Sequence, residues 1–546
     1  MTVPLSRTLA GLLALGLCFM AATRPAMAQD TKTEVKPKTL TEDQRIVHFL
    51  NRFTLGATPE LCAEVKEKGM KAWLQEQFKG AREEPKALTS ALAELGSLEL
   101  SSDDIVEKYV EPKNKDATEK EKREARKLEN VPQRELLDAI MLRAVLSNNQ
   151  LREVSADFFR NHFAVSLDKG PVKWMAVDYE REAIRKHALG NFPDMLSATA
   201  HHPAMLFFLD NTLSSRPATP AEIAAIEKRA KGKSEKIIEE LRQRGLNENY
   251  ARELMELHTL GVDNYYKQED VIEVAKCLTG WTIAPRFAAK PLAFWFRRDA
   301  HCSGDKVVLG QTIKEDAASP QNEGEEVLKL LSAHPGTAQF LARKLCVWLV
   351  NDDPSEAMIK RIAAVFSAKK GDLPSVFMAI FEDPEFFAIE NFQAKYKRPF
   401  EFVVSALRAT GATVSDPWEL HRALTNMAEP IYRCDNPTGF YDFAEAWNDP
   451  GAMSLRWKAA LDLANGKVRG ITLPASLYAD LDAAKPETWK AALARKILCV
   501  PLSEHTSRAL DEVVAARVKA NPKLKIKDLA PELVAGLLGS PEFQKQ

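Results

Sequence analysis

The stretch NENYARELMELHTLGVDNYYKQEDVIEVAKCLTGW, residues 247–281, indicates the fold most clearly. Tyr250, Leu254 and Leu257 recur at i, i+4 and i+7, which predicts one apolar face of a short α-helix. Gly261 stands where a left-handed helix end is expected. Two side-chain oxygens near the start can cap this helix, those of Asn247 and Asn249.

A second short helix is predicted directly after the first. Val271, Val274, Ala275 and Leu278 lie on one face at helical spacing, and Gly280 ends the helix. The same periodicity dominates from Thr41 to the C-terminus. The sequence therefore predicts a mainly α, multi-helix globular fold.

One acidic residue is on the apolar side of the first helix. With about 100° per residue, Glu253 lies between Leu257 and Leu260, and His258 lies on the other flank. A carboxylate on an inward face is costly unless it is paired, hydrogen-bonded or bound to a metal ion. Residues 253 and 258 are about 140° apart on the wheel, so a shared site needs side chains from elsewhere. A structural network is the simpler interpretation, and a functional site is the alternative.

Composition excludes some classes of protein. The chain has 546 residues, of which 45% are hydrophobic, so it is long enough for two or three domains with a sizeable core. Lys and Arg number 75 and Asp and Glu 76, giving a net charge of −1. This balance provides no general attraction to nucleic acid or anionic membrane.

The N-terminus has the features of a secretory signal. Arg7 precedes an apolar run over residues 9–22, and Ala26-Met27-Ala28 is a cleavage pattern. We expect residues 1–28 to be a signal peptide, residues 29–40 a flexible leader, and the mature protein to be periplasmic or extracellular. No later apolar stretch approaches ~18 residues, so the mature chain is not expected to span a membrane.

Six cysteines remain after the predicted signal: Cys62, Cys277, Cys302, Cys346, Cys434 and Cys499. No C-x-x-C pattern occurs, which argues against a zinc ribbon, a thioredoxin-like motif and c-type haem attachment. An exported protein can oxidise its cysteines, but the sequence does not choose among the pairings, and buried free thiols are equally consistent with it.

The helical body is divided into an N-terminal region, residues 41–330, and a C-terminal region, residues 331–546. The second region contains a weak repeat. LARKLCV at 341–347 and DLPSVFMAIFEDPEF at 372–386 recur as LARKILCV at 493–500 and DLAPELVAGLLGSPEF at 528–543. This order predicts a duplicated helical unit in which Cys346 and Cys499 are equivalent and buried.

Three further segments interrupt the pattern. Residues 111–130 and 216–245 are dense in charge of both signs, which is typical of exposed helices or insertions. Residues 292–309 contain AFWFRRD and KVVLG around a glycine-containing turn, which predicts a small β-hairpin. Asp299, His301 and Asp305 lie near its expected tip.

Several long motifs resemble those of one bacterial family. They are RFTLGATP (52–59), GMKAWLQEQF (69–78), RNHFAVS (160–166), HPAMLFFLDN (202–211), NENYARELMELHTLGV (247–262), HPGTAQFLARKL (334–345), KRPFEFVVSALRA (397–409) and PTGF (437–440). Together they are similar to the family catalogued as domain of unknown function 1800. The resemblance implies an exported, largely helical protein without an established activity. It also implies a partner, since members often occur beside a second exported family that is sulfatase- or alkaline-phosphatase-like. Two positions depart from the family pattern, Cys302 where an Asp is usual and Lys267 where a Thr or Ser is usual.

No standard catalytic motif is present, whether G-x-S-x-G, H-E-x-x-H, a Walker loop or G-x-G-x-x-G. What remains is a set of imidazoles and one carboxylate within the family-like motifs: His162, His202, Glu253, His258 and His301. Such groups are common acid–base pairs and common ligands of divalent ions. We name Glu253, His258, His162 and His301 as candidate catalytic residues. The candidate ligands of a divalent metal are His162, His202, Glu253 and His301.

Each candidate also has a simpler structural explanation, such as a core histidine at 162 or a helix cap at 202. Two hypotheses follow. The first is an accessory or scaffold subunit that works with another exported protein. The alternative is an exported hydrolase-like enzyme with a His/carboxylate site, with or without a metal ion.

Overall fold

The computed structural model describes residues 39–110, 116–229, 245–262, 264–285, 288, 290–521 and 525–546. Over these residues the fold is mainly α-helical, as predicted, with three small two-stranded antiparallel sheets. The expected signal peptide and leader residues 29–38 lie outside the described residues. No described helix is long and apolar enough to cross a membrane.

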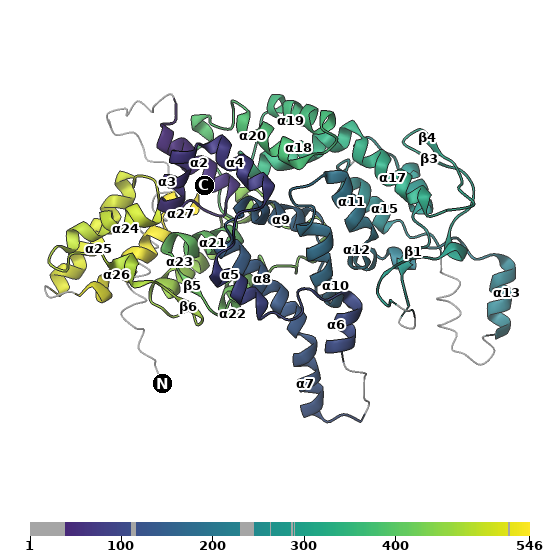
Figure 1. Ribbon diagram of the computed structural model, residues 1–546, viewed down its shortest axis with the longest axis horizontal. Helices are drawn as coiled ribbons and strands as arrows, with labels where there is room; N and C mark the ends of the chain where they lie inside the picture. The colour runs from purple at the N-terminus through teal and green to yellow at the C-terminus, as the bar shows by residue number, and fades with distance from the viewer. Residues whose placement is uncertain are drawn as a thin grey trace.

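The N-terminal half is a succession of short helices. They are α2 (Glu42–Phe53), α3 (Pro59–Lys68), α4 (Met70–Lys79), α5 (Lys86–Ala93), α6 (Ser102–Tyr109), α7 (Glu119–Glu129), α8 (Val131–Leu146), α9 (Gln150–His162), α10 (Val172–Asp178), the π-helix η2 (Tyr179–Arg185), α11 (Phe192–His201), α12 (Pro203–Phe208) and α13 (Pro220–Arg229). Charge-dense α7 buries no residue and protrudes from the body (Figure 1), which confirms an exposed helix there. Residues 230–244 of the second charged segment lie outside the described residues.

The stretch at 247–281 forms the two predicted helices, α15 (Asn249–Glu256) and α16 (Gln268–Cys277). The Asn247 side-chain oxygen accepts a hydrogen bond from the Asn249 amide at 2.9 Å, although the N-cap residue of α15 is Glu248, which makes no side-chain cap. Gly261 and Gly280 have φ of +87° and +84°, the left-handed conformation expected after each helix.

The predicted hairpin over residues 292–309 is wrong. β2 (Phe294–Phe296) pairs with β1 (Trp281–Ile283), and β3 (Lys306–Val308) pairs with β4 (Gln311–Ile313). The reason is the tight turn at Leu309 and Gly310, where φ is positive at both residues. Such a two-residue turn matches the twist of antiparallel strands, so β3 pairs with the strand that follows it. A third sheet joins two short strands, β5 (Thr413–Val414) and β6 (Ile471–Thr472).

The C-terminal half contains the remaining helices. They are α17 (Asn322–Ala333), α18 (Pro335–Leu349), α19 (Glu356–Ala368), α20 (Leu373–Glu382), α21 (Pro399–Thr410), α22 (Trp418–Asn426), α23 (Pro450–Ala464), α24 (Trp489–Ile497), α25 (Glu504–Ala520), α26 (Ile526–Leu538) and α27 (Pro541–Gln544).

The predicted repeat corresponds to two helical units, α18–α20 and α24–α26. In both, the glutamate of the closing PEF motif bonds the start of the middle helix. Glu385 accepts from the Ser355 hydroxyl at 2.9 Å, and Glu542 accepts from the Ser503 amide at 2.9 Å. The units differ at the equivalent cysteines, because Cys346 is buried whereas Cys499 is only half-buried.

One continuous apolar core runs from α2 to Phe543. The two ends of the described chain come together: α24 contacts α3, and the C-terminal residues pair with residues 395–397. There Lys395 and Gln546 exchange backbone hydrogen bonds, and the Lys397 amide donates to the Gln544 carbonyl. In Figure 1 the C-terminus accordingly lies beside α2 and α3. The boundary expected near residue 330 stays a prediction.

Candidate functional site: a buried charge cluster

Helix α9 carries charge on a buried face. Glu153, Asp157 and Arg160 recur at i, i+4 and i+7, share one stripe and are all buried. An isolated buried charge is very unfavourable, so each needs a partner from another element. For Glu153 the partner is Arg185 of η2, whose two terminal nitrogens lie 2.6 and 2.7 Å from the carboxylate oxygens.

Arg160 makes a bidentate pair with Glu180, which also belongs to η2. Nη2 and Nε of Arg160 lie 2.8 and 3.0 Å from the two oxygens of Glu180. The Tyr432 hydroxyl donates to the same carboxylate at 2.6 Å. Burial opposes the charge on Glu180, but Arg160, Arg185 and Tyr432 together hold the pKa of this carboxyl below its ordinary value. π-Helical turns of this kind are frequent at functional sites.

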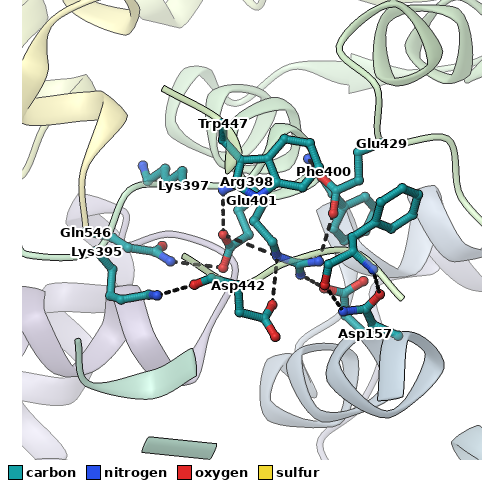
Figure 2. Close-up of polar contacts among 12 residues, drawn as sticks. Asp157, Lys395, Lys397, Arg398, Phe400, Glu401, Glu429, Asp442, Trp447 and Gln546 are labelled. Carbon is teal, nitrogen blue, oxygen red and sulfur yellow. Dashed lines mark hydrogen bonds and ion pairs between the residues drawn. The ribbon is translucent and has the colours of Figure 1, made fainter. Parts of the chain in front are cut away.

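The Arg398 guanidinium is the centre of the cluster (Figure 2). It pairs with Asp157 of α9 and, at 2.7 Å, with Glu429. Its Nε lies 3.6 Å from an Asp442 oxygen and 3.8 Å from a Glu401 oxygen. One side chain thus connects α9, the start of α21 and two points of the loop between α22 and α23.

Acidic groups outnumber the cations that touch them at this centre. Burial raises the pKa of Glu429 to about 7, although Arg398 acts in the opposite direction. Burial likewise raises the pKa of Asp442 above its ordinary value against the effect of Arg398 and Lys344. The second Glu429 oxygen accepts from the Phe400 amide at 2.7 Å. The cluster can therefore hold a proton near neutral pH.

The loop over residues 440–447 is fixed to this cluster by hydrogen bonds with Lys395 and Asp352. Lys395 donates to the Asp442 backbone carbonyl and to the Asp352 carboxylate. The other Asp352 oxygen accepts from the Ala444 amide at 2.8 Å. Burial lowers the pKa of Lys395, and Asp352 acts against this shift.

Asn161 anchors the start of the same loop. Its side-chain amide donates to the Phe440 carbonyl at 2.8 Å and accepts from the Phe440 amide at 2.7 Å. Gly439 lies so close that a Cβ atom there would stand 2.4 Å from the Asn161 carbonyl oxygen. The PTGF motif therefore requires glycine at this position.

A small cavity of about 40 Å³ lies against the cluster and is lined in part by Asp157, Arg398, Tyr432 and Phe440. By volume it has room for about three water molecules. Ligand pockets usually measure ~300–1,000 Å³, so a cavity of this size suits solvent better than a substrate.

Two of the predicted residues, His162 and His258, lie together at the edge of the cluster. Their ring centroids are 6.1 Å apart, and Nε2 of His162 is 3.2 Å from the His258 carbonyl oxygen. Lys344 Nζ is 3.1 Å from His162 Nδ1. Burial and then Lys344 lower the pKa of His162 well below its ordinary value, and the same two causes lower the pKa of His258 to about 3.

The side chains of the other predicted residues, His202, His301 and Glu253, form no hydrogen bond, ion pair or ring contact with the His162–His258 pair. His202 caps α12 by accepting from the Ala204 amide at 3.2 Å, as its structural explanation predicted. His301 is 3.1 Å from Glu323, which in turn pairs with Lys306 at 2.5 Å. Glu253 is half-buried rather than buried, and its carboxylate makes no hydrogen bond or ion pair with a described residue.

The proposed metal site stays a prediction. Within the described residues, no hydrogen bond, ion pair or ring contact joins His202, Glu253 or His301 to one another or to His162. The described ranges contain no group of three or more His, Cys, Asp or Glu side chains arranged to hold a metal ion. Of the two acids near the expected hairpin tip, Asp299 is exposed, and Asp305 pairs with Lys314 at 2.5 Å.

The buried charge cluster was not predicted from the sequence. One signal was present, the charged stripe of Glu153, Asp157 and Arg160 on a helix that otherwise carries core phenylalanines. Periodicity could have placed these residues on a buried face. It could not have identified Arg398, which is 241 residues from Asp157 along the chain.

Removing Arg398 tests the cluster. Arg398→Met leaves Glu429 buried without its cation and leaves Asp157 with Arg160 as its remaining cation, and breaking one side of a buried ion pair costs about 3–5 kcal/mol. We expect the free energy of unfolding in urea at pH 7 to fall by this amount. Arg343→Met removes the exposed pair with Glu356 and should cost less than about 1 kcal/mol. Equal midpoints for the two variants would contradict a central role for Arg398.

His258 predicts a specific dependence on pH. Its pKa is about 3 in the folded protein and about 6.5 when unfolded. Between these values the unfolded chain binds more protons, so stability rises with pH and its contribution is complete above about 6.5. In His258→Gln the increase in unfolding free energy between pH 4 and 6.5 should be smaller, by on the order of 1 kcal/mol per pH unit. The exposed His505→Gln is the control, and a slope equal to that of the wild type would disprove the assignment.

Comparison with known proteins places the chain by family. No curated protein and no solved structure matches it significantly. One family model matches residues 48–545, which is nearly the whole chain and includes every residue of the buried charge cluster. The chain belongs to the family described as "Protein of unknown function (DUF1800)".

Proposed function

We propose that this protein is an exported accessory or scaffold subunit that binds another exported protein through its loop 440–447. The observation that carries the proposal is the pairing of Asn161, Asp352, Lys395 and Arg398 with this loop from beneath. These four polar residues, of which Asn161 and Arg398 belong to the family-like motifs, thus hold the loop in one conformation.

The outer side of the loop presents aromatic rings. The exposed fractions of Tyr441 and Phe443 are 54% and 37%, and their ring centroids are 4.9 Å apart. The Trp447 indole N–H donates to the Tyr441 carbonyl at 2.8 Å and further restrains the loop. Aromatic anchors that lose little conformational freedom are typical centres of protein–protein interfaces.

The partner follows from the family resemblance, which points to an exported sulfatase- or alkaline-phosphatase-like protein. An accessory role also agrees with the small cavity and with the internal pairing of the charged groups. Export is part of the proposal and is supported by the signal-like residues 1–28.

Co-purification tests this proposal. The full chain is expressed with an exported sulfatase- or alkaline-phosphatase-like protein of the same organism, and the complex is captured through a tag on that partner. The double variant Tyr441→Ala/Phe443→Ala removes the two rings without touching the cluster, so we expect binding to weaken at least ~10-fold. Trp295→Ala is the matched control, since Trp295 is 43% exposed on β2. Equal recovery of the double variant and the wild type would refute the proposed surface.

A hydrolase is the second candidate, favoured by the contact between Lys344 and His162. Burial lowers the pKa of both groups, and Lys344 lowers the pKa of His162 further, whereas Asp442 acts against the shift of Lys344. An amine in contact with an imidazole can serve as an acid–base pair, and burial raises the pKa of the nearby Asp442 carboxyl.

Turnover of chromogenic phosphate, sulfate and carboxylate esters distinguishes this candidate. If Lys344 and His162 act as acid and base, Lys344→Met and His162→Gln should each reduce turnover ~100-fold or more. His505→Gln should leave it unchanged, and thermal melts show whether each variant is folded. Turnover that survives both substitutions would exclude this pair.

A further inference from the structure

The six cysteines outside the predicted signal are all described and all carry free thiols. Cys277 and Cys346 are buried, whereas the other four are half-buried. Cys62 and Cys499 are the two whose thiols hydrogen-bond to each other. They come from opposite ends of the chain, since Cys62 is on α3 and Cys499 follows α24.

The backbone brings these two positions together. Helices α3 and α24 are in contact. Cys499 has φ of +55°, a left-handed conformation that is uncommon for a residue with a side chain. Both side chains pack partly on the apolar core and remain partly exposed, so a small reagent can reach them.

We propose that Cys62 and Cys499 form a reversible disulfide that links the first helices to the C-terminal helical unit. The inference does not depend on the proposed function, because it concerns contacts on a different part of the molecule. It selects one pairing from those that the sequence left open.

The chemistry is thiol–disulfide exchange with a small disulfide such as oxidised glutathione. The Cys62 thiolate attacks one glutathione sulfur, a mixed disulfide forms, and one glutathione leaves. Cys499 then loses its proton and attacks the Cys62 sulfur, which releases the second glutathione. Two electrons pass to the oxidant, and the two protons end on the two glutathione thiols.

The order of attack agrees with the local electrostatics. The hydrogen bond from Cys499 lowers the pKa of the Cys62 thiol, although burial acts against the shift. The same contact and then burial raise the pKa of Cys499. Cys62 is therefore the more readily ionised partner, and the thiolate is the nucleophile in such exchange.

The test uses the full chain, which has 7 cysteines. Reduced protein is incubated with oxidised glutathione, and its thiols are counted after denaturation. We expect the count to fall by two, the intact mass to fall by about 2 Da, and a non-reducing digest to yield one peptide pair joining Cys62 to Cys499. Closing so long a loop should also raise the Tm by on the order of 5 °C relative to the reduced protein.

Two variants sharpen the result. Cys62→Ser should lose no thiol on oxidation, and Cys499→Ser serves the same purpose if the first variant does not fold. The double variant Cys277→Ser/Cys302→Ser should still lose two. An unchanged thiol count, a lasting mixed disulfide on Cys62, or a digest that joins another pair would overturn the proposal.

Discussion

The Arg398 guanidinium is the interaction on which the central part of this structure depends. It precedes α21 and contacts carboxylates of α9 and of the loop between α22 and α23. Because a guanidinium is planar and stays charged, it can serve several carboxylates in fixed directions. Replacing the whole cluster with apolar residues need not destabilise a protein. In this protein the cluster fixes the relative positions of the segments that carry it, because each ion pair joins one segment to another.

The segment that carries Arg398 is itself held from two sides. On one side, Lys395 and Lys397 bond the backbone of Gln546 and Gln544, and the Gln546 side chain donates to Glu401 at 2.9 Å. On the other side, Lys395 reaches Asp352 and the Asp442 carbonyl. The backbone that carries Arg398 is thus held by contacts other than the ion pairs of Arg398 itself, so these pairs need to order the side chain but not the backbone.

Local patterns in the sequence predicted local structure well. The periodicity and glycines of residues 247–281 identified both helices, and the repeated motifs identified the two equivalent units. The hairpin over 292–309 failed because strand pairing depends on which turn closes most tightly. The strand pairing is set by the two-residue turn at Leu309 and Gly310, where φ is positive, and the alternation of apolar and polar residues does not reveal such a turn.

The candidate site was harder to predict for a different reason. The helical wheel placed Glu253 on a buried face between Leu257 and Leu260, but α15 ends at Glu256, so those leucines do not continue the helix and Glu253 is only half-buried. His162 and His258 do meet, yet the cation between the motifs is Lys344, which the repeat had identified only as part of LARKLCV. Long-range ion pairs leave no periodic signal, so a single sequence shows the charged stripe on α9 without showing what faces it.

The two repeat units show how one architecture can be used differently. In the aligned motifs Lys344 corresponds to Lys496. Lys344 turns inward to His162, whereas Lys496 donates to the Ser476 carbonyl at 2.7 Å and pairs with Asp480. The PEF glutamates keep the same structural contact in both units, so that contact belongs to the shared architecture. The two lysines do not share a contact, so the inward contact of Lys344 depends on the packing of the first unit against α9. Because the first unit faces α9 and the second faces α3 and α21, α18 brings Lys344 to His162 of α9, whereas the second unit joins the two ends of the described chain.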